Sequence, residues 1–235
     1  MIRLELNGAH VAFSTREGGV SEGPYESLNL GILTDDDQTR VAENRGRLAA
    51  ALGLDPASVA MGWQVHGNEL RDWHAAPEQG GYAHAGAELP KVDGHTTSEP
   101  NLGLLVLAAD CLPVALASHD RVAMLHCGWR GLAAGIVERA LEEFPEPPAA
   151  ALGPSIEACC YEVGPEVLQA FDDVEGAAIG RHLSLRKVAA EKLRSAGVTQ
   201  IESVELCTSC REDMFFSHRR DGGVTGRQAG IIWRT

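Results

Sequence analysis

The sequence has no long hydrophobic run and no excess of basic residues, and each absence limits what the protein can do. No window approaches the length of a membrane span, which excludes an integral membrane protein. The formal net charge of -13 argues against a nucleic-acid-binding surface, because phosphate backbones are bound by clustered Lys and Arg. We therefore expect neither nucleic acid nor membrane among the partners, although a few local arginines could hold a small anion.

The N-terminus also lacks an apolar segment of signal-peptide length. It reads MIRLELNGAHVAF, with the alternating apolar residues typical of a first β-strand. We therefore expect a cytoplasmic protein, in which disulfides rarely persist. The cysteines should then be free thiols, available as ligands or nucleophiles. They are Cys111, Cys127, Cys159, Cys160, Cys207 and Cys210.

No change in composition and no internal repeat divides the 235 residues. A chain of this length can bury a core without covalent staples, so we expect a single domain over residues 1–235. Strands and helices are predicted along it without regular βαβ alternation. The predicted fold class is therefore α/β, a layered arrangement with a mixed, largely antiparallel sheet.

Turn and capping residues mark the predicted elements. Asp37 and Gly53 bound a helix that ends near Leu52, after a long polar loop over 13–31. Apolar or alternating segments predict strands at 58–67, 69–75, 101–118, 120–129, 149–155, 203–207 and 231–233. Helical patterns cover 132–144, 165–171 and 183–197, and residues 76–100 are predicted to be loop because they contain repeated Gly and Pro without a steady period.

Two reactive side chains, Cys111 and His126, lie within apolar strand segments. If residues 118–121 form a hairpin with a two-residue loop, His126 pairs with Pro113, two residues along the strand from Cys111. Cys111 and His126 then share one face as diagonal neighbours, about 7–8 Å apart between backbones. A loop one residue longer or shorter would put them on opposite faces. In the favoured register they can meet over one metal ion; the structural alternative is a core cysteine and a hydrogen-bonded histidine.

His66 is the best-placed third ligand, because it ends an apolar segment and precedes Gly67. Two imidazoles and one thiolate would leave the fourth position of a zinc ion open, which is the arrangement of a catalytic site. The structural alternative for His66 is a histidine at a strand end that faces water.

The other cysteines give weaker signals. Cys127 should point to the sheet face opposite the preceding histidine, and one of Cys159 and Cys160 is expected in the core. Cys207 and Cys210 form a CxxC with no second CxxC and no nearby pair of histidines, so a zinc ribbon would lack half its ligands. Packing is therefore favoured over redox chemistry for this pair.

Eight motifs occur in a fixed order: STREGGVS, SLNLG, QVHG, VDG, ADCLPV, HCGWRG, LGPSI and FFSHRRDGGVTGRQ. Together, from Phe13 to Trp233, they closely resemble the laccase-domain family, whose better-supported activity is purine nucleoside phosphorolysis. The resemblance implies a fold similar to that of a class of cysteine hydrolases. It also implies metal ligands at His66, Cys111 and His126, with zinc as the cofactor and copper able to displace it.

The implied function is a zinc-dependent purine nucleoside phosphorylase, which converts adenosine, inosine or methylthioadenosine and phosphate to free base and ribose 1-phosphate. Adenosine deamination is a second activity of the family. Cys111 and His126 would be catalytic, together with Arg130, which precedes a predicted helix and could bind phosphate. Arg16 and Asn29 lie in long loops, where they could contact ribose or phosphate. The sequence does not indicate an oligomeric state.

Three alternatives stay open at this point. Cys111 could be the nucleophile and His126 the general base of a metal-free hydrolase acting on peptidoglycan precursors. The family's historical name suggests a copper-dependent polyphenol oxidoreductase, but multicopper sites need many imidazoles, and the nine histidines include no HxH pair. A binding module without enzymatic activity could use the same cleft.

Overall fold

The structure is a computed structural model that describes residues 1–78, 80–83 and 87–235. The strands are β1 (Ile2–Leu6), β2 (Ala9–Phe13), β3 (Val59–Ala60), β4 (Leu70–Trp73), β5 (Gly94–Thr97), β6 (Gly103–Ala108), β7 (Leu112–Ala117), β8 (Val122–Cys127), β9 (Ala149–Leu152), β10 (Ala178–Ile179), β11 (His182–Leu183), β12 (Ile201–Ser203) and β13 (Gln228–Arg234). The helices are α1 (Gln38–Leu52), α2 (Trp129–Ala133), α3 (Ile136–Leu141), α4 (Pro165–Gln169) and α5 (Leu185–Ser195), with short 3-10 helices η1 (Gly23–Tyr25) and η2 (Pro56–Ser58). No described helix is both long enough and apolar enough to span a bilayer.

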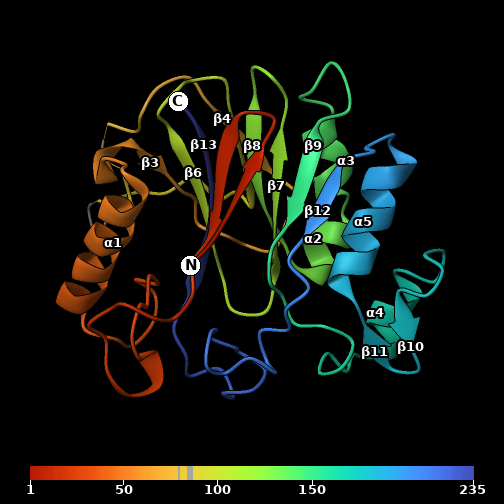
Figure 1. Ribbon diagram of the computed structural model, residues 1–235. Coiled ribbons are helices and arrows are strands. Elements are labelled where there is room, and N and C mark those ends of the chain that lie inside the picture. The colour runs from red at the N-terminus through yellow and green to blue at the C-terminus, as the bar shows by residue number, and fades with distance from the viewer. Residues whose placement is uncertain (79, 84–86) are drawn as a thin grey trace.

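Two large sheets pack face to face between outer layers of helix (Figure 1). The five-stranded sheet has the order β1-β2-β13-β6-β3, and the six-stranded sheet has the order β12-β9-β7-β8-β5-β4. Helix α1 covers the first sheet, whereas α2, α3 and α5 cover the second. Most strand pairs are antiparallel, with parallel pairs at β3–β6, β4–β5 and β9–β12. The predicted α/β class with mixed, largely antiparallel pairing is therefore confirmed.

Alternation along the central strands builds the layers. On β8, Met124 packs between the two sheets, while Leu125 and Cys127 pack under the helices. Neighbouring β7 behaves alike, with Ala115 on the inter-sheet face and Val114 on the helix face. Both faces of these strands are buried, which explains why their sequences are continuously apolar. Cys127 thus lies on the face opposite His126, as predicted.

Helix α1 forms where its caps predict it. The Asp37 carboxylate accepts hydrogen bonds from the backbone N–H groups of Thr39 (2.8 Å) and Arg40 (3.3 Å), and these bonds satisfy two free donors of the first turn. Gly53 ends the helix with φ of 71°, in the left-handed region that glycine adopts without strain.

The predicted strand over 101–118 is wrong. It is two strands, β6 and β7, which belong to different sheets and are joined by a sharp corner at 109–111. Both halves are apolar because both are buried, so hydrophobicity alone does not reveal the corner. The crossover between sheets places Cys111 at the end of the layered core.

Other boundaries also differ from the prediction. Residues 76–100 are not all loop, because Gly94–Thr97 form buried β5, whose polar sequence GHTT carries no strand signal. The strand predicted over 58–67 is limited to Val59–Ala60, and the one over 203–207 lies at 201–203. The N-terminal segment is a hairpin that turns at Asn7 and Gly8, and the helix predicted over 132–144 is divided at Gly135, whose φ is 85°.

Candidate active site and metal centre

Three side chains from distant parts of the chain converge at one end of the sheets. His66 lies in the loop after β3, Cys111 at the β6–β7 corner, and His126 on β8. Their ligand atoms all lie within 4.8 Å of one another, and the two imidazole rings meet edge to face with centroids 4.9 Å apart. Pro113 pairs with His126, so the predicted hairpin register is confirmed.

Buried Asp93 organizes both imidazoles. One carboxylate oxygen accepts hydrogen bonds from His126 Nδ1 (2.8 Å) and from the backbone N–H of His66 (2.9 Å). The other accepts from the backbone N–H groups of Val65 (3.0 Å) and Gly67 (2.8 Å). Burial opposes ionisation, but these hydrogen bonds and the neighbouring His126 hold the pKa of Asp93 below its usual value. The carboxylate therefore stays charged and fixes the loop that carries His66.

The Asp93 contact also determines which His126 nitrogen is available. A carboxylate is an acceptor, so Nδ1 carries a proton. Burial would lower the pKa of His126, but the Cys111 thiolate and Asp93 raise it to about 9, so Nε2 is also protonated and would give up that proton to a metal ion. Histidine ligands of metal ions are commonly oriented by such a carboxylate. His66 has φ of 61°, a conformation that costs a non-glycine residue about 1–3 kcal/mol, and the three backbone hydrogen bonds to Asp93 hold it there.

Cys111 is set up as a thiolate. Burial alone would raise its pKa, but the charge of His126 and hydrogen bonds from both histidines outweigh burial and lower the pKa of the thiol. Two nitrogens and one sulfur on a tetrahedral zinc ion would be about 3.3–3.6 Å apart, given Zn–N of about 2.0–2.1 Å and Zn–S of about 2.3 Å. The donor types and their spacing therefore fit one zinc ion.

A second set of hydrogen bonds fixes the corner before Cys111. Asp110 has φ of 91°, and its carboxylate accepts hydrogen bonds from the Thr208 hydroxyl (2.7 Å) and from the backbone N–H of Arg219 (2.7 Å). Its carbonyl oxygen accepts from the backbone N–H of Ile156 (2.9 Å). The C-terminal segment, about a hundred residues further along the sequence, thus fixes the corner that positions the Cys111 thiol.

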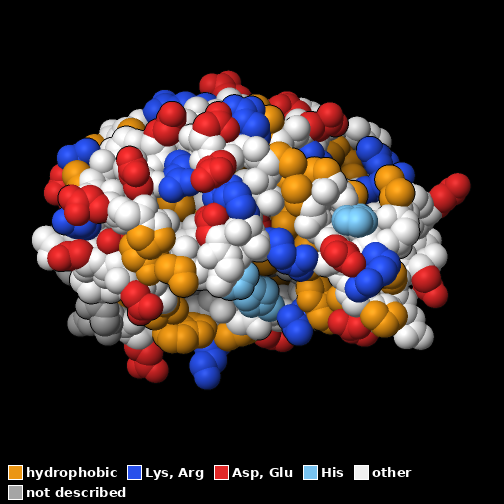
Figure 2. Space-filling model, turned by 90° about the horizontal axis from the view of Figure 1, so that it is seen from below, with side chains coloured by type: hydrophobic (Ala, Val, Ile, Leu, Met, Phe, Trp, Pro, Cys, Tyr) orange, Lys and Arg blue, Asp and Glu red, His pale blue; other side chains and the backbone are white. Residues whose placement is uncertain are grey.

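The side chains of His66, Cys111 and His126 line a cavity of about 790 Å³. This volume lies within the range of about 300–1,000 Å³ typical of small-molecule sites. Its walls combine apolar and aromatic side chains, including Met61, Trp63 and Tyr161, with the guanidinium groups of Arg130 and Arg219. On the face seen from below, histidine (pale blue) and basic side chains (blue) lie side by side near the centre, with apolar patches (orange) around them (Figure 2).

The family model described as multi-copper polyphenol oxidoreductase laccase matches residues 10–235. The chain belongs to this family. A purine nucleoside phosphorylase of Streptomyces griseus is 40% identical, over 96% of this chain and 94% of its own length. The purine nucleoside phosphorylase YfiH of Escherichia coli is 38% identical over the same shares of the two chains. The family assignment therefore rests on nearly the whole chain.

Solved structures of family members have the same fold. The hypothetical protein YfiH of Bacillus licheniformis superposes with a TM-score of 0.91 at 33% identity, covering 97% of this chain and 94% of the other. YlmD of Geobacillus stearothermophilus has a TM-score of 0.90 at 34% identity, with coverage of 97% and 92%.

The arginines and the asparagine predicted at the site lie in different places. Arg130 lines the cavity, with its guanidinium 4.5 Å from the Trp129 ring. Arg16 is not among the cavity-lining residues; it donates to the carbonyl oxygens of Glu26 (2.6 Å) and Glu212 (3.1 Å) and so joins two loops.

Asn29 is completely buried and likewise lies behind the cavity wall. Its side-chain oxygen accepts hydrogen bonds from the backbone N–H groups of Gly31 (3.0 Å) and Arg227 (2.9 Å), which both line the cavity. Asn29 therefore supports the backbone of the cavity wall.

Sequence reasoning gave no role to Asp93 and Arg227, which the fold places at this site. Asp93 lies in the VDG motif, whose three residues are all buried. A buried carboxylate is uncommon unless it is paired. Arg219 and Arg227 line the cavity from the FFSHRRDGGVTGRQ motif. That motif is rich in basic residues, but nothing in its spacing identifies which arginine turns inward.

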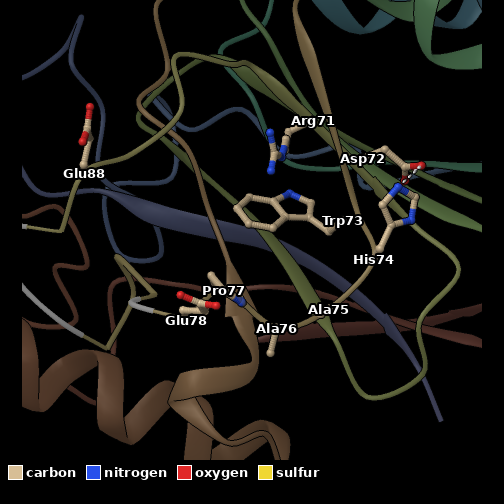
Figure 3. A pocket seen from close by; sticks show the side chains of 9 residues that line it. All are labelled: Arg71, Asp72, Trp73, His74, Ala75, Ala76, Pro77, Glu78 and Glu88. Atoms are coloured by element: carbon tan, nitrogen blue, oxygen red, sulfur yellow. Dashed lines mark ion pairs between the residues drawn. The ribbon is translucent and has the colours of Figure 1, made fainter.

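A second depression, of about 520 Å³, lies along edge strand β4 and the segment after it (Figure 3). The Arg71 guanidinium lies 5.4 Å from the Trp73 ring, and His74 contacts Asp72 at 3.6 Å. The four side chains belong to consecutive residues of one segment, and two of them are bound within the fold: Asp72 pairs with Arg121 (2.7 Å), and Trp73 Nε1 donates to His95 Nδ1 (3.1 Å). We therefore place the chemistry in the larger cavity, where ligands from three segments meet.

Proposed function

We propose that the chain is a zinc-dependent purine nucleoside phosphorylase that cleaves adenosine, inosine or methylthioadenosine with phosphate. The observation that carries this proposal is the convergence of His66, Cys111 and His126 on a cavity that also contains guanidinium groups. Relatives named purine nucleoside phosphorylase support the general activity. A cavity of about 790 Å³ has room for a nucleoside and a phosphate together.

The three ligands would hold zinc with one position open to the cavity, where the ion supplies a Lewis acid for an oxygen of phosphate or water. Asp93 holds a proton of His126 on Nδ1, so the imidazole would bind the ion as a neutral ligand through Nε2. Chemistry at an open position of this kind also accommodates adenosine deamination, which we propose as a second activity.

The arginines supply the anion site. Guanidinium groups bind phosphate through paired, charge-assisted hydrogen bonds. Arg130 and Arg219 line the same cavity, and the Arg219 guanidinium is held 5.1 Å from the Tyr161 ring and donates to the Glu162 carbonyl oxygen (2.7 Å). We assign phosphate binding to this pair and stacking of the purine to the aromatic wall. Holding both reactants in line would account for much of the rate enhancement.

Asn29 and Arg16 then act as positioning residues. Asn29 holds the backbone of Gly31 and Arg227, and Arg16 joins the 13–31 loop to the segment at Glu212. Loss of either side chain should raise KM for substrate more than it lowers kcat.

The test is incubation of the purified chain with adenosine, inosine or methylthioadenosine, with and without phosphate. We expect free base only when phosphate is present, and loss of that activity in His66→Ala, Cys111→Ala and His126→Ala. His74→Ala, which changes an exposed histidine of the second depression, is the matched control and should keep full activity. No base in any reaction would overturn the proposal.

A thiol hydrolase is the competing function, because Cys111 and His126 also have the composition of a nucleophile–base pair. Chelation separates the two mechanisms. Loss of activity that zinc restores supports the metal enzyme, whereas activity that survives the chelator but not a thiol alkylator supports the hydrolase and a peptidoglycan precursor as its substrate. Copper-dependent oxidation of phenols would instead require activity that copper restores and zinc does not.

A further inference from the structure

Four cysteines lie together away from the proposed active site. Cys159 and Cys160 occupy the turn after β9, and Cys207 and Cys210 occupy the turn after β12. The prediction that Cys159 or Cys160 belongs to the core is wrong, because Cys159 is exposed and Cys160 is only partly buried. The sequence suggested that the CxxC of Cys207 and Cys210 lacks half the ligands of a zinc site, but the fold places two further thiols, Cys159 and Cys160, beside it.

The sulfur positions match a single tetrahedral ion. All four Sγ atoms lie within 4.8 Å of one another; Cys210 Sγ is 3.5 Å from Cys159 Sγ and 3.3 Å from Cys160 Sγ. Four thiolates on one zinc ion would be about 3.8 Å apart, given Zn–S of about 2.3 Å. A disulfide would require about 2.05 Å between bonded sulfurs. The separations between the sulfur atoms are therefore too long for a disulfide and suit ligands around one ion.

The surroundings also suit a metal thiolate. The backbone N–H of Glu157 donates to Cys207 Sγ at 3.5 Å, and such hydrogen bonds stabilise a charged sulfur ligand. Only Cys207 is buried; Cys159 and Cys210 are exposed, so as protonated thiols they would bury little apolar area and gain little from packing. A divalent ion would give the cluster a stabilising role that hydrophobic burial does not supply.

We propose that Cys159, Cys160, Cys207 and Cys210 bind one structural zinc ion, distinct from any metal at His66, Cys111 and His126. Because all four positions of the ion would be filled by protein, the site would stabilise the fold and would not take a substrate. Its softer, all-sulfur donor set also separates it chemically from the mixed nitrogen and sulfur ligands of the active site.

The proposed ion would connect two turns that shape the active-site cavity. Cys160 is followed directly by Tyr161, which lines that cavity. Cys207 is followed by Thr208, whose hydroxyl donates to the Asp110 carboxylate beside Cys111. Zinc in the cysteine cluster should therefore order the cavity wall and the corner that carries the catalytic thiol.

The test separates the two sites by removing one at a time. A Cys111→Ala/His126→Ala variant, purified and desalted, should retain one zinc per chain by elemental analysis. Adding Cys207→Ser and Cys210→Ser should abolish that zinc, whereas Ser209→Ala, which changes one of the two residues between them, should retain it. Cobalt in place of zinc should show intense thiolate-to-metal charge-transfer absorption only when the four cysteines are present.

A second measurement leaves the four cysteines unchanged, so that loss of zinc through misfolding of a cysteine variant does not affect the result. In the Cys111→Ala/His126→Ala variant, zinc should protect Cys159 and Cys210 from an alkylating reagent, and a chelator should make both react; mass spectrometry identifies the modified residues. Equal alkylation with and without zinc, or no zinc retained by this variant, would overturn the proposal. So would a disulfide within the cluster in protein purified under reducing conditions. Failure of phosphorolysis alone would leave this result unchanged, because no assay here uses nucleoside.

Discussion

Replacing Asp93 with asparagine should damage the metal site without removing a ligand. The carboxylate accepts four hydrogen bonds, two on each oxygen, from His126 Nδ1 and the backbone of residues 65–67. Asparagine has one acceptor oxygen, so its NH₂ group would face two N–H donors. Losing two hydrogen bonds to a charged acceptor would cost about 3–6 kcal/mol, at about 1.5–3 kcal/mol each.

The effect on His66 depends on whether the remaining hydrogen bonds can still offset the cost of its backbone conformation. Two neutral hydrogen bonds of about 1 kcal/mol each would only match the cost of about 1–3 kcal/mol for its left-handed backbone. The loop should therefore relax away from His126. We expect zinc affinity at this site to fall about 10–100-fold, which is typical when a residue that orients a metal ligand is lost.

The assay is competition for zinc against a chromogenic chelator, together with phosphate-dependent base release. It should be run in the Cys207→Ser/Cys210→Ser background if the cysteine cluster also binds zinc. Asp72→Asn, at a partly exposed aspartate paired at 2.7 Å with Arg121, the residue before β8, is the matched control and should bind zinc normally. Zinc affinity within twofold of the parent in Asp93→Asn would refute the assigned role of Asp93.

Three further changes test other parts of the structure. Gly128→Ala should lower zinc affinity about tenfold or more, because a Cβ there would lie 3.0 Å from His66 Cδ2 and 3.2 Å from Cys111 Sγ; unchanged zinc binding would contradict this packing. Arg130→Ala should raise KM for phosphate about tenfold or more, since a charge-assisted hydrogen bond contributes about 1.5–3 kcal/mol, and Arg139→Ala, on the neighbouring helix, should not. Leu104→Ala should lower the free energy of unfolding by about 2–5 kcal/mol in urea titration, because this fully buried side chain fills the core between the sheets; a loss below about 1 kcal/mol would contradict it.

Local signals were enough to predict much of this molecule. The caps of α1 and the hairpin between β7 and β8 depend on neighbouring residues, and both form as predicted. That hairpin register puts His126 opposite Pro113 and so makes the meeting with Cys111 foreseeable from the sequence. His66 was placed by its position at the end of an apolar segment.

The missed features depend on contacts between distant segments. The β6–β7 corner is held by Thr208 and Arg219, about a hundred residues away, so nothing near Asp110 reveals it. Strand β5 is buried although its sequence is polar, because it lies between β4 and β8 and its side chains find partners there. The four-cysteine cluster joins turns about 50 residues apart, and the chain shows only one CxxC.

The most direct test of the account is restoration of activity by zinc in the chelator-treated chain. Phosphate-dependent release of purine base should disappear after chelation and return as zinc is added, while His66→Ala, treated identically, should not recover. Full activity in the metal-depleted parent chain, or equal recovery by His66→Ala, would contradict the claim that His66, Cys111 and His126 act together through one metal ion.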